Sequence, residues 1–185
     1  MKSGKLIIIT GPSAVGKTVV AKELLKKIKN SKRIITYTTR RPRAGEKDGV
    51  DYNFLSKQEF EKKLKEDFFI EWATVYKQYY GNSGEDIESA LQNGHTIIMV
   101  LDVQGMKTIK EKLPKAIAFF ILPESSQQLE KRLWERPDAN EENIKTRLNK
   151  AKSEIKNYQK SANHSIINQE NQLNKTIKQI ITLIA

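Results

Sequence analysis

Residues 11–18 read Gly-Pro-Ser-Ala-Val-Gly-Lys-Thr, and this stretch decides the fold. Gly11 and Gly16 allow the backbone to turn tightly and to direct successive N–H groups toward one point. Lys17 adds a mobile positive charge, and the Thr18 hydroxyl is a suitable oxygen ligand for Mg²⁺. The pattern is typical of a loop that binds nucleotide phosphates. The predicted loop residues are Gly11, Pro12, Ser13, Ala14, Val15, Gly16, Lys17 and Thr18.

The segments on either side of this loop support the interpretation. Residues 6–9, Leu-Ile-Ile-Ile, predict a short buried strand, and residues 19–28 carry apolar side chains at helical spacing. The N-terminus of such a helix would add its dipole to phosphate binding. A chance match in a glycine-rich turn would not require a strand before it and a helix after it.

The rest of the chain repeats this alternation of strand and helix. Further strands are predicted at 34–38, 69–76, 96–102, 116–122 and 165–168. Helices are predicted after the capping box that begins at Ser56, from Ser83 to Gly94, from Ser125 or Ser126, from Asn140, and over the last residues. Strands alternating with helices predict an α/β fold, in which a parallel sheet is flanked by helices in three layers.

Composition narrows the classes of protein. The 185 residues suit one domain, and the absence of cysteine excludes a disulfide framework and a thiolate metal site. The longest apolar run, residues 116–122, is far shorter than a membrane span, and the N-terminal apolar run is too short for a signal peptide. We therefore expect a cytoplasmic protein with no membrane partner.

The formal net charge of +11, from 33 Lys and Arg against 22 Asp and Glu, favours anionic ligands. Nucleic acid is not the expected ligand, because no basic stripe with interleaved aromatic residues is present. Three arginines at positions 40, 41 and 43 lie on a segment punctuated by Pro42 and Gly45. They are either an anion site or a solvated basic loop, because such a segment cannot belong to the core.

Taken in order, several segments of the chain resemble the guanylate kinase family from Leu6 to the last helix. Besides the loop at 11–18, they are Thr-Thr-Arg-Arg-Pro-Arg-Ala-Gly-Glu, Gly-Val-Asp-Tyr-Asn-Phe, Phe-Ile-Glu-Trp-Ala, Tyr-Tyr-Gly, Leu-Asp-Val-Gln-Gly, Arg-Leu-Trp-Glu-Arg and Ile-Ile-Asn-Gln. Each motif alone is ordinary, whereas their order and spacing together are specific.

The resemblance implies a P-loop nucleoside-monophosphate kinase fold with inserted GMP-binding and lid regions. The core would comprise about 1–35, 84–125 and 153–185, the GMP-binding region about 36–83 and the lid about 126–152. The implied reaction transfers the γ-phosphoryl group of ATP to GMP, and to dGMP, with Mg²⁺ bound to the ATP. The chain would act as a monomer or a homodimer.

The resemblance also implies roles for individual residues. The GMP phosphate would be held by Arg40, Arg43, Tyr52 and Tyr80. Glu71 would read guanine, with Asn82 and Asp102 close to the base, and Thr36 would supply a hydroxyl for GMP binding where the family commonly has serine. The catalytic cations would be Lys17, Arg132, Arg136 and Arg147. Asn168 would lie near the donor adenine, and Thr18 would bind the metal.

Four positions depart from the family pattern. Asn82 stands in place of a serine or threonine, Lys77-Gln78 in place of Gly-Asn, Val100 in place of an acid, and Pro137 in place of a glycine. Asp102 and Glu71 also have structural alternatives, since each could simply end a strand. A guanylate-kinase-like protein-binding module is the alternative function. Such modules tend to have degraded phosphate loops, whereas Lys17 and Thr18 are intact here.

Overall fold

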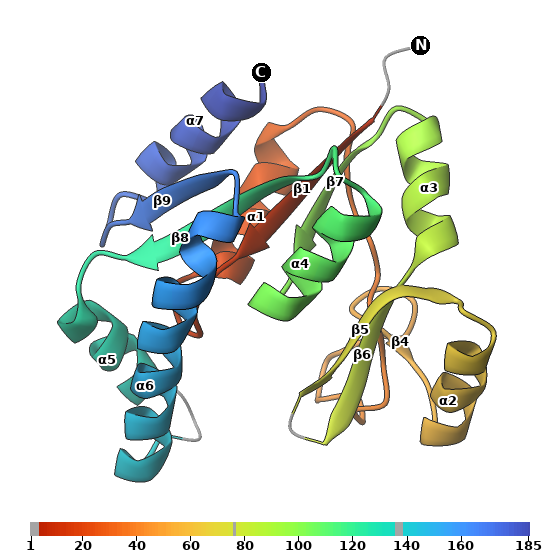
Figure 1. Cartoon of the computed structure of the whole chain (residues 1–185), viewed down its shortest axis with the longest axis horizontal. Helices are drawn as coiled ribbons and strands as arrows, with labels where there is room; N and C mark the ends of the chain where they lie inside the picture. The colour runs from red at the N-terminus through yellow and green to blue at the C-terminus, as the bar shows by residue number, and fades with distance from the viewer. Residues whose placement is uncertain (1–3, 76, 136–138) are drawn as a thin grey trace.

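The computed structural model describes residues 4–75, 77–135 and 139–185 (Figure 1). Its larger sheet has five parallel strands in the order β2-β7-β1-β8-β9. These strands are β1 (Lys5–Thr10), β2 (Ser31–Arg33), β7 (Thr96–Val100), β8 (Ile117–Pro123) and β9 (His164–Asn168). The predicted parallel α/β architecture is therefore confirmed, and the phosphate loop follows the central strand.

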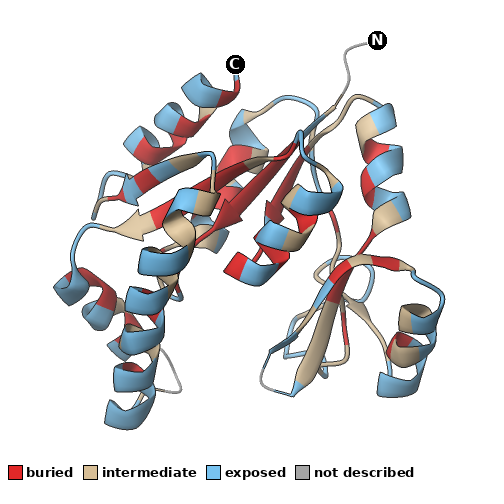
Figure 2. Cartoon of the chain, in the orientation of Figure 1, coloured by how far each residue is buried: buried red, intermediate tan, exposed pale blue. Residues whose placement is uncertain are grey.

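Helices cover both faces of this sheet because successive side chains of a strand point to opposite faces. Ile7 and Ile9 pack into one apolar cluster with α1, α5, α6 and α7, while Ile8 packs into a second cluster with α3 and α4. Figure 2 shows these buried strands in red between the helices. The helices are α1 (Lys17–Lys27), α3 (Gly84–Gln92), α4 (Val103–Lys112), α5 (Ser126–Trp134), α6 (Glu141–Tyr158) and α7 (Leu173–Ile184), and a short 3₁₀ turn, η1 (Gln159–Ser161), follows α6.

A second, four-stranded sheet lies within the segment that the resemblance assigns to GMP binding. Its strands, in spatial order, are β4 (Asn53–Phe54), β3 (Tyr37–Thr38), β6 (Gln78–Ser83) and β5 (Phe69–Val75). Helix α2 (Lys57–Lys65) packs on it, with the Phe60 ring stacked on Phe69 at 4.3 Å between centroids. The predicted capping box is confirmed, since Ser56 and Glu59 exchange side-chain and backbone hydrogen bonds.

This second sheet with α2 and the α5–α6 pair project from the same side of the central sheet (Figure 1). The two projecting parts are therefore both placed near the ends of β1 and β7, where the phosphate loop and Asp102 follow the strands. Within the described residues, none of the helices combines the length and apolar character needed to cross a membrane.

Some secondary-structure predictions were wrong or incomplete. Of the strand predicted at 34–38 only Tyr37–Thr38 is a strand, because the chain leaves the central sheet after Arg33 and joins the second sheet at Tyr37. Ile34 instead packs into the apolar cluster beneath α3 and α4. Strands β2, β4 and β6 and helix α4 were also not predicted; Gly81 lies within β6 and Gly105 within α4, where glycine weakens the sequence pattern. Position 76, predicted as the end of a strand, lies outside the described residues.

Candidate active site

The phosphate loop requires glycine at both of its motif positions. Gly11 and Gly16 have φ values of 130° and 95°, where L side chains are strained. A Cβ on Gly11 would lie 2.4 Å from the Ile121 carbonyl oxygen, and one on Gly16 would lie 2.7 Å from Asn168 Nδ2. Lys17 Nζ donates to the carbonyl oxygens of Gly11 and Pro12, each at 2.7 Å. The loop thus folds around its own lysine.

Two residues from distant elements hold the same loop carbonyl. Asn168, at the end of β9, donates from Nδ2 to the Val15 oxygen at 2.9 Å, and Arg132 Nη1 of α5 donates to it at 3.4 Å. The Asn168 Oδ1 accepts from the Thr176 hydroxyl at 3.2 Å. Asn168 therefore contacts the loop directly, and its predicted place near adenine stays a prediction.

Two cavities meet at Thr18. A cavity of about 610 Å³ is lined by phosphate-loop residues together with Arg132 and Asn168. A second cavity of about 260 Å³ is lined by residues of α1, the second sheet and the end of β7. The predicted residues in its wall are Thr36, Tyr52, Glu71, Tyr80, Asn82 and Asp102. Thr18 lines both cavities, so ligands in the two would approach each other at this residue.

Glu71 is the buried carboxylate of the smaller cavity, with only 5% of the residue exposed. Asn82 Nδ2 donates to its Oε1 at 2.5 Å, and the Asn82 Oδ1 in turn accepts from the Thr36 hydroxyl at 3.0 Å. Burial raises the pKa of Glu71 to about 7. The Asn82 hydrogen bond and Lys112 oppose this rise, while Asp102 adds to it. Thr36 and Asn82 thus fix the position of Glu71.

Asp102 lies beside the phosphate loop because β7 and β1 are parallel neighbours, with Ile9 opposite Val100. Its Oδ1 accepts from the Gly105 N–H at 2.8 Å, so Asp102 is the N-cap of α4. The structural alternative of a capping carboxylate is therefore confirmed, and a contact with the base stays a prediction. Val100, where the family has an acid, lines the smaller cavity and is 40% exposed.

The arginine loop is organised by a residue that the sequence did not single out. Glu46 Oε1 accepts from Arg40 Nη2 at 2.9 Å, and its Oε2 accepts from the backbone N–H of Arg43 at 2.8 Å. The Glu46 hydrogen bond, and more weakly one to Tyr80, raise the pKa of Arg40. Arg40 also lies over the Tyr52 ring at 5.2 Å. Arg40, Tyr52 and Tyr80 are thus gathered together, whereas Arg43 is exposed.

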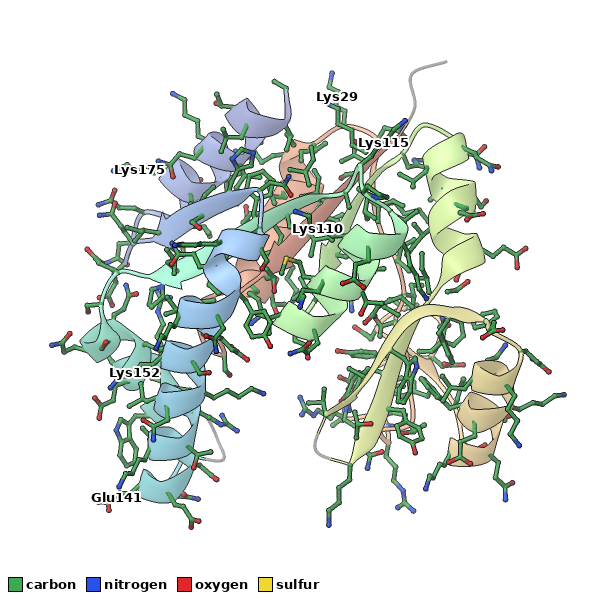
Figure 3. The ribbon with its side chains drawn as sticks, in the orientation of Figure 1. Lys29, Lys110, Lys115, Glu141, Lys152 and Lys175 are labelled. Atoms are coloured by element: carbon green, nitrogen blue, oxygen red, sulfur yellow. The ribbon has the colours of Figure 1, made fainter. Side chains whose placement is uncertain are left out.

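The predicted lid residues are only partly described. Arg132 lies on α5, and Arg147 lies on α6 between Glu141 and Lys152, which Figure 3 labels on that helix. Arg136 and Pro137 lie outside the described residues. Sequence reasoning missed Glu154 of α6, whose side chain is 13% exposed and lies 3.8 Å from Lys150 Nζ. Burial raises the pKa of Glu154, against the opposing charges of Lys150 and Lys17. Its helical spacing from the buried Ala151 was the available signal.

The donor set at Thr18 fits a hard cation such as Mg²⁺. Mg²⁺ prefers oxygen ligands and is commonly bound through few protein groups and the substrate phosphates. The Thr18 hydroxyl supplies one such oxygen, since Thr18 lines both cavities, and Asp102 is a further oxygen donor in the wall of the smaller cavity. Within the parts of the chain that the structure describes, no cluster of three His, Cys, Asp or Glu forms a separate metal site.

Similarity to known proteins extends over nearly the whole chain. A model of the guanylate kinase family matches residues 3–185. The chain belongs to the guanylate kinase family. The guanylate kinase of Caldanaerobacter subterraneus subsp. tengcongensis is 40% identical over 183 residues, covering 99% of this chain and 87% of that protein. Membership of the guanylate kinase family makes the chain a nucleoside monophosphate kinase, and therefore a phosphotransferase.

The structure is also similar to solved structures of kinases. The crystal structure of guanylate kinase from Anaplasma phagocytophilum has a TM-score of 0.79 and 26% sequence identity, covering 100% of this chain and 86% of that one. A shikimate kinase from Acinetobacter baumannii has a TM-score of 0.55 at 14% identity, covering 99% and 94% of the two chains. At 14% identity, the similarity to the shikimate kinase shows a shared fold alone.

Proposed function

We propose that this member of the guanylate kinase family transfers the γ-phosphoryl group of ATP to GMP, and to dGMP, giving ADP and the nucleoside diphosphate. The observation that carries the proposal is the shared wall at Thr18. One cavity contains the phosphate loop and the other contains the buried Glu71. A phosphoryl donor and an acceptor bound in these two cavities would meet at Thr18, as an in-line transfer requires.

The donor cavity suits ATP. Loop N–H groups and Lys17 would bind the outer phosphates, and the N-terminus of α1 adds its dipole. Asn168 and Arg132 support the loop through the Val15 carbonyl. Mg²⁺ would be held by Thr18 and the phosphates, where it supplies charge neutralisation.

The acceptor cavity suits GMP. Guanine presents adjacent N1–H and N2–H donors, and an ionised Glu71 can accept both. Thr36 and Asn82 hold this carboxylate, and Asp102 lies on the same wall. Arg40, Arg43, Tyr52 and Tyr80 would bind the phosphate of GMP through charged forks and phenolic donors. Among these, Arg40 is the cation that already contacts Tyr52.

Catalysis in this arrangement needs no side-chain base. The nucleophile is a phosphate oxygen of GMP, which is largely ionised at neutral pH because its second pKa is about 6. The protein positions two polyanions and neutralises their repulsion. We assign residues of about 36–83 to GMP binding and about 126–152 to a lid, whose arginines Arg132, Arg136 and Arg147 would approach the transferring group after both nucleotides bind.

A coupled assay of ADP release tests the proposal. With ATP as donor, GMP and dGMP should be turned over, whereas AMP, UMP and CMP should react far more slowly. A chain that binds GMP but releases no ADP with any acceptor would instead be a guanylate-kinase-like binding module.

Glu71→Ala tests the guanine assignment separately. The variant should lose about 2–4 kcal/mol of transition-state stabilisation in kcat/KM for GMP, with little change for AMP. Equal losses for both substrates in a folded variant would show that Glu71 only shapes the fold. Folding would be checked by circular dichroism at the assay temperature.

A further inference from the structure

Gly105 lies in the first turn of α4, where no backbone constraint explains a glycine. Gly105 is not among the glycines with a positive φ in the described residues, which are Gly11, Gly16, Gly45, Gly49 and Gly94. Glycine in a helix is less favourable than alanine by about 1 kcal/mol. An alanine would therefore favour α4, unless a side chain at this position met a neighbour.

The neighbour is the Glu71 carboxylate. A Cβ built on Gly105 would lie 2.7 Å from Glu71 Oε2 and 3.5 Å from Glu71 Cδ. The same Cβ would lie 3.4 Å from Asp102 Oδ1, which is an ordinary contact. The obstruction is thus specific to one oxygen of one side chain.

The two oxygens of Glu71 are positioned by different elements. Oε1 accepts from Asn82, its cross-strand partner in the second sheet. Oε2 lies against the bare Cα side of Gly105, on a helix that packs on one face of the central sheet. Helix α4 is attached to the same strand, since Lys112 Nζ donates to the Ile70 carbonyl oxygen at 2.6 Å. The orientation of the carboxylate therefore depends on both sheets.

We propose that Gly105 is a specificity-positioning residue, whose missing side chain allows Glu71 to turn both oxygens toward a guanine base. The inference rests on the proposed function of Glu71. A methyl group at position 105 would displace Oε2 by about 0.3 Å or more, because packed atoms do not approach within about 3 Å of a Cβ and the contact here would be 2.7 Å. One of two charge-assisted hydrogen bonds to guanine would then be lost or misaligned.

A double-mutant cycle tests the proposal, using the wild type, Gly105→Ala, Glu71→Ala and the double variant. Gly105→Ala should lower kcat/KM for GMP roughly 10-fold to 100-fold while leaving AMP turnover and the KM for ATP within about 2-fold. Added to Glu71→Ala, it should change GMP turnover by less than about 2-fold, because the obstructed carboxylate is already gone. The double variant should be at least as stable as Glu71→Ala, since alanine favours the helix.

Gly84→Ala is the matched control, because Gly84 also lies in the first turn of a helix. Its added Cβ would meet only Ile70 Cβ at 3.5 Å, and GMP turnover should stay within about 2-fold of the wild type. A Gly105→Ala variant that folds poorly while the double variant folds well would support the obstruction. Failure of both to fold would overturn the proposal, since α4 packing would then require the glycine.

The remaining outcomes separate this inference from the proposed function. If Glu71→Ala changes GMP and AMP turnover equally, Glu71 does not read guanine and the function assigned to it fails. If Glu71→Ala is selective for GMP but Gly105→Ala has no effect, the inference about Gly105 is overturned alone. Full additivity of the two substitutions would also overturn it.

Discussion

Glu71 and Asn82 face each other across the β5–β6 pair, and the Asn82 amide donates to the Glu71 carboxylate at 2.5 Å. One hydrogen bond from an uncharged amide does not offset the loss of hydration of a buried carboxylate. Burial therefore prevails, and the pKa of Glu71 is raised to about 7. The proposed guanine reader titrates close to neutral pH, so its charge is sensitive to what binds beside it.

The raised pKa of Glu71 gives the stability of the protein a definite pH dependence. From pH 4.5 to 7 the folded protein holds a proton at Glu71 that the unfolded chain has released, so the free energy of unfolding falls as pH rises. At about 1.4 kcal/mol per pKa unit, the total effect is about 3 kcal/mol. Glu71→Gln should therefore gain up to about 3 kcal/mol relative to the wild type between pH 4.5 and 8.

Urea unfolding of both proteins at pH 4.5, 6, 7 and 8 measures this difference. The exposed Glu88→Gln, on α3, is the control and should follow the wild-type curve at every pH. A constant difference between Glu71→Gln and the wild type across this range would contradict the raised pKa.

Glu46 is expected to organise the arginine loop, which carries Arg40 and Arg43, rather than to stabilise the fold. It joins the Arg40 side chain to the Arg43 backbone on a partly exposed loop, where screening by water limits what an ion pair adds to stability. Glu46→Ala should therefore raise the KM for GMP about 5-fold through lost preorganisation, with the KM for ATP and the melting temperature nearly unchanged. Steady-state kinetics measures both constants. Glu61→Ala, which removes a surface ion pair of α2 to Lys57, should leave them unaltered.

The sequence predicted best what is encoded in consecutive residues. The strand, loop and helix around Gly11–Thr18 follow from one apolar run and one motif, and all three are present. Contacts between distant segments were less accessible. Thr36, Asn82 and Glu71 were each assigned to GMP binding, but their chain of hydrogen bonds depends on the pairing of β5 with β6, and β6 was not predicted. Local patterns do not determine such pairings.

Other candidate residues were missed because their contacts, too, depend on how the chain folds. Glu46 lies on a loop whose three arginines were noted, yet its choice of partner depends on how that loop folds. Gly105 belonged to a quoted segment, but its meaning comes from Glu71 on another sheet. Glu154 became visible only when α6 was placed beside Lys17 and Asp102. In each case the role depends on contacts that only the folded chain makes.

Lys77 occupies a strained backbone position and is expected to limit stability. Its φ is 64°, in the left-handed region that costs a residue with a side chain about 1–2 kcal/mol. Glycine avoids this strain but gives the unfolded chain more freedom, so Lys77→Gly should raise the free energy of unfolding by about 0.5–1 kcal/mol. Chemical denaturation measures the gain. Lys65→Gly, in the last turn of α2, should lower stability instead, and a loss in both variants would argue against the strain at Lys77.

Lys17→Ala separates the two proposed nucleotide sites. Lys17 lines the larger cavity and donates to loop carbonyls, whereas Glu71 belongs to β5 of the second sheet and Arg40 to the loop that follows β3. The substitution should lower kcat by about 100-fold or more, because a cation on the transferring phosphoryl group is lost. The dissociation constant for GMP should change less than about 3-fold, since the proposed contacts to GMP stay intact.

Calorimetry with GMP alone, without ATP, measures that dissociation constant. Lys26→Ala is a suitable control, because Lys26 lies on the same helix but pairs with Glu23 at the exposed surface. It should preserve both kcat and GMP affinity. If Lys17→Ala weakened GMP binding as strongly as it lowered kcat, the larger cavity would have to hold the acceptor, and the assignment of donor and acceptor would be reversed. Retained GMP affinity with lost transfer places the phosphoryl donor at Lys17, on the far side of Thr18 from Glu71.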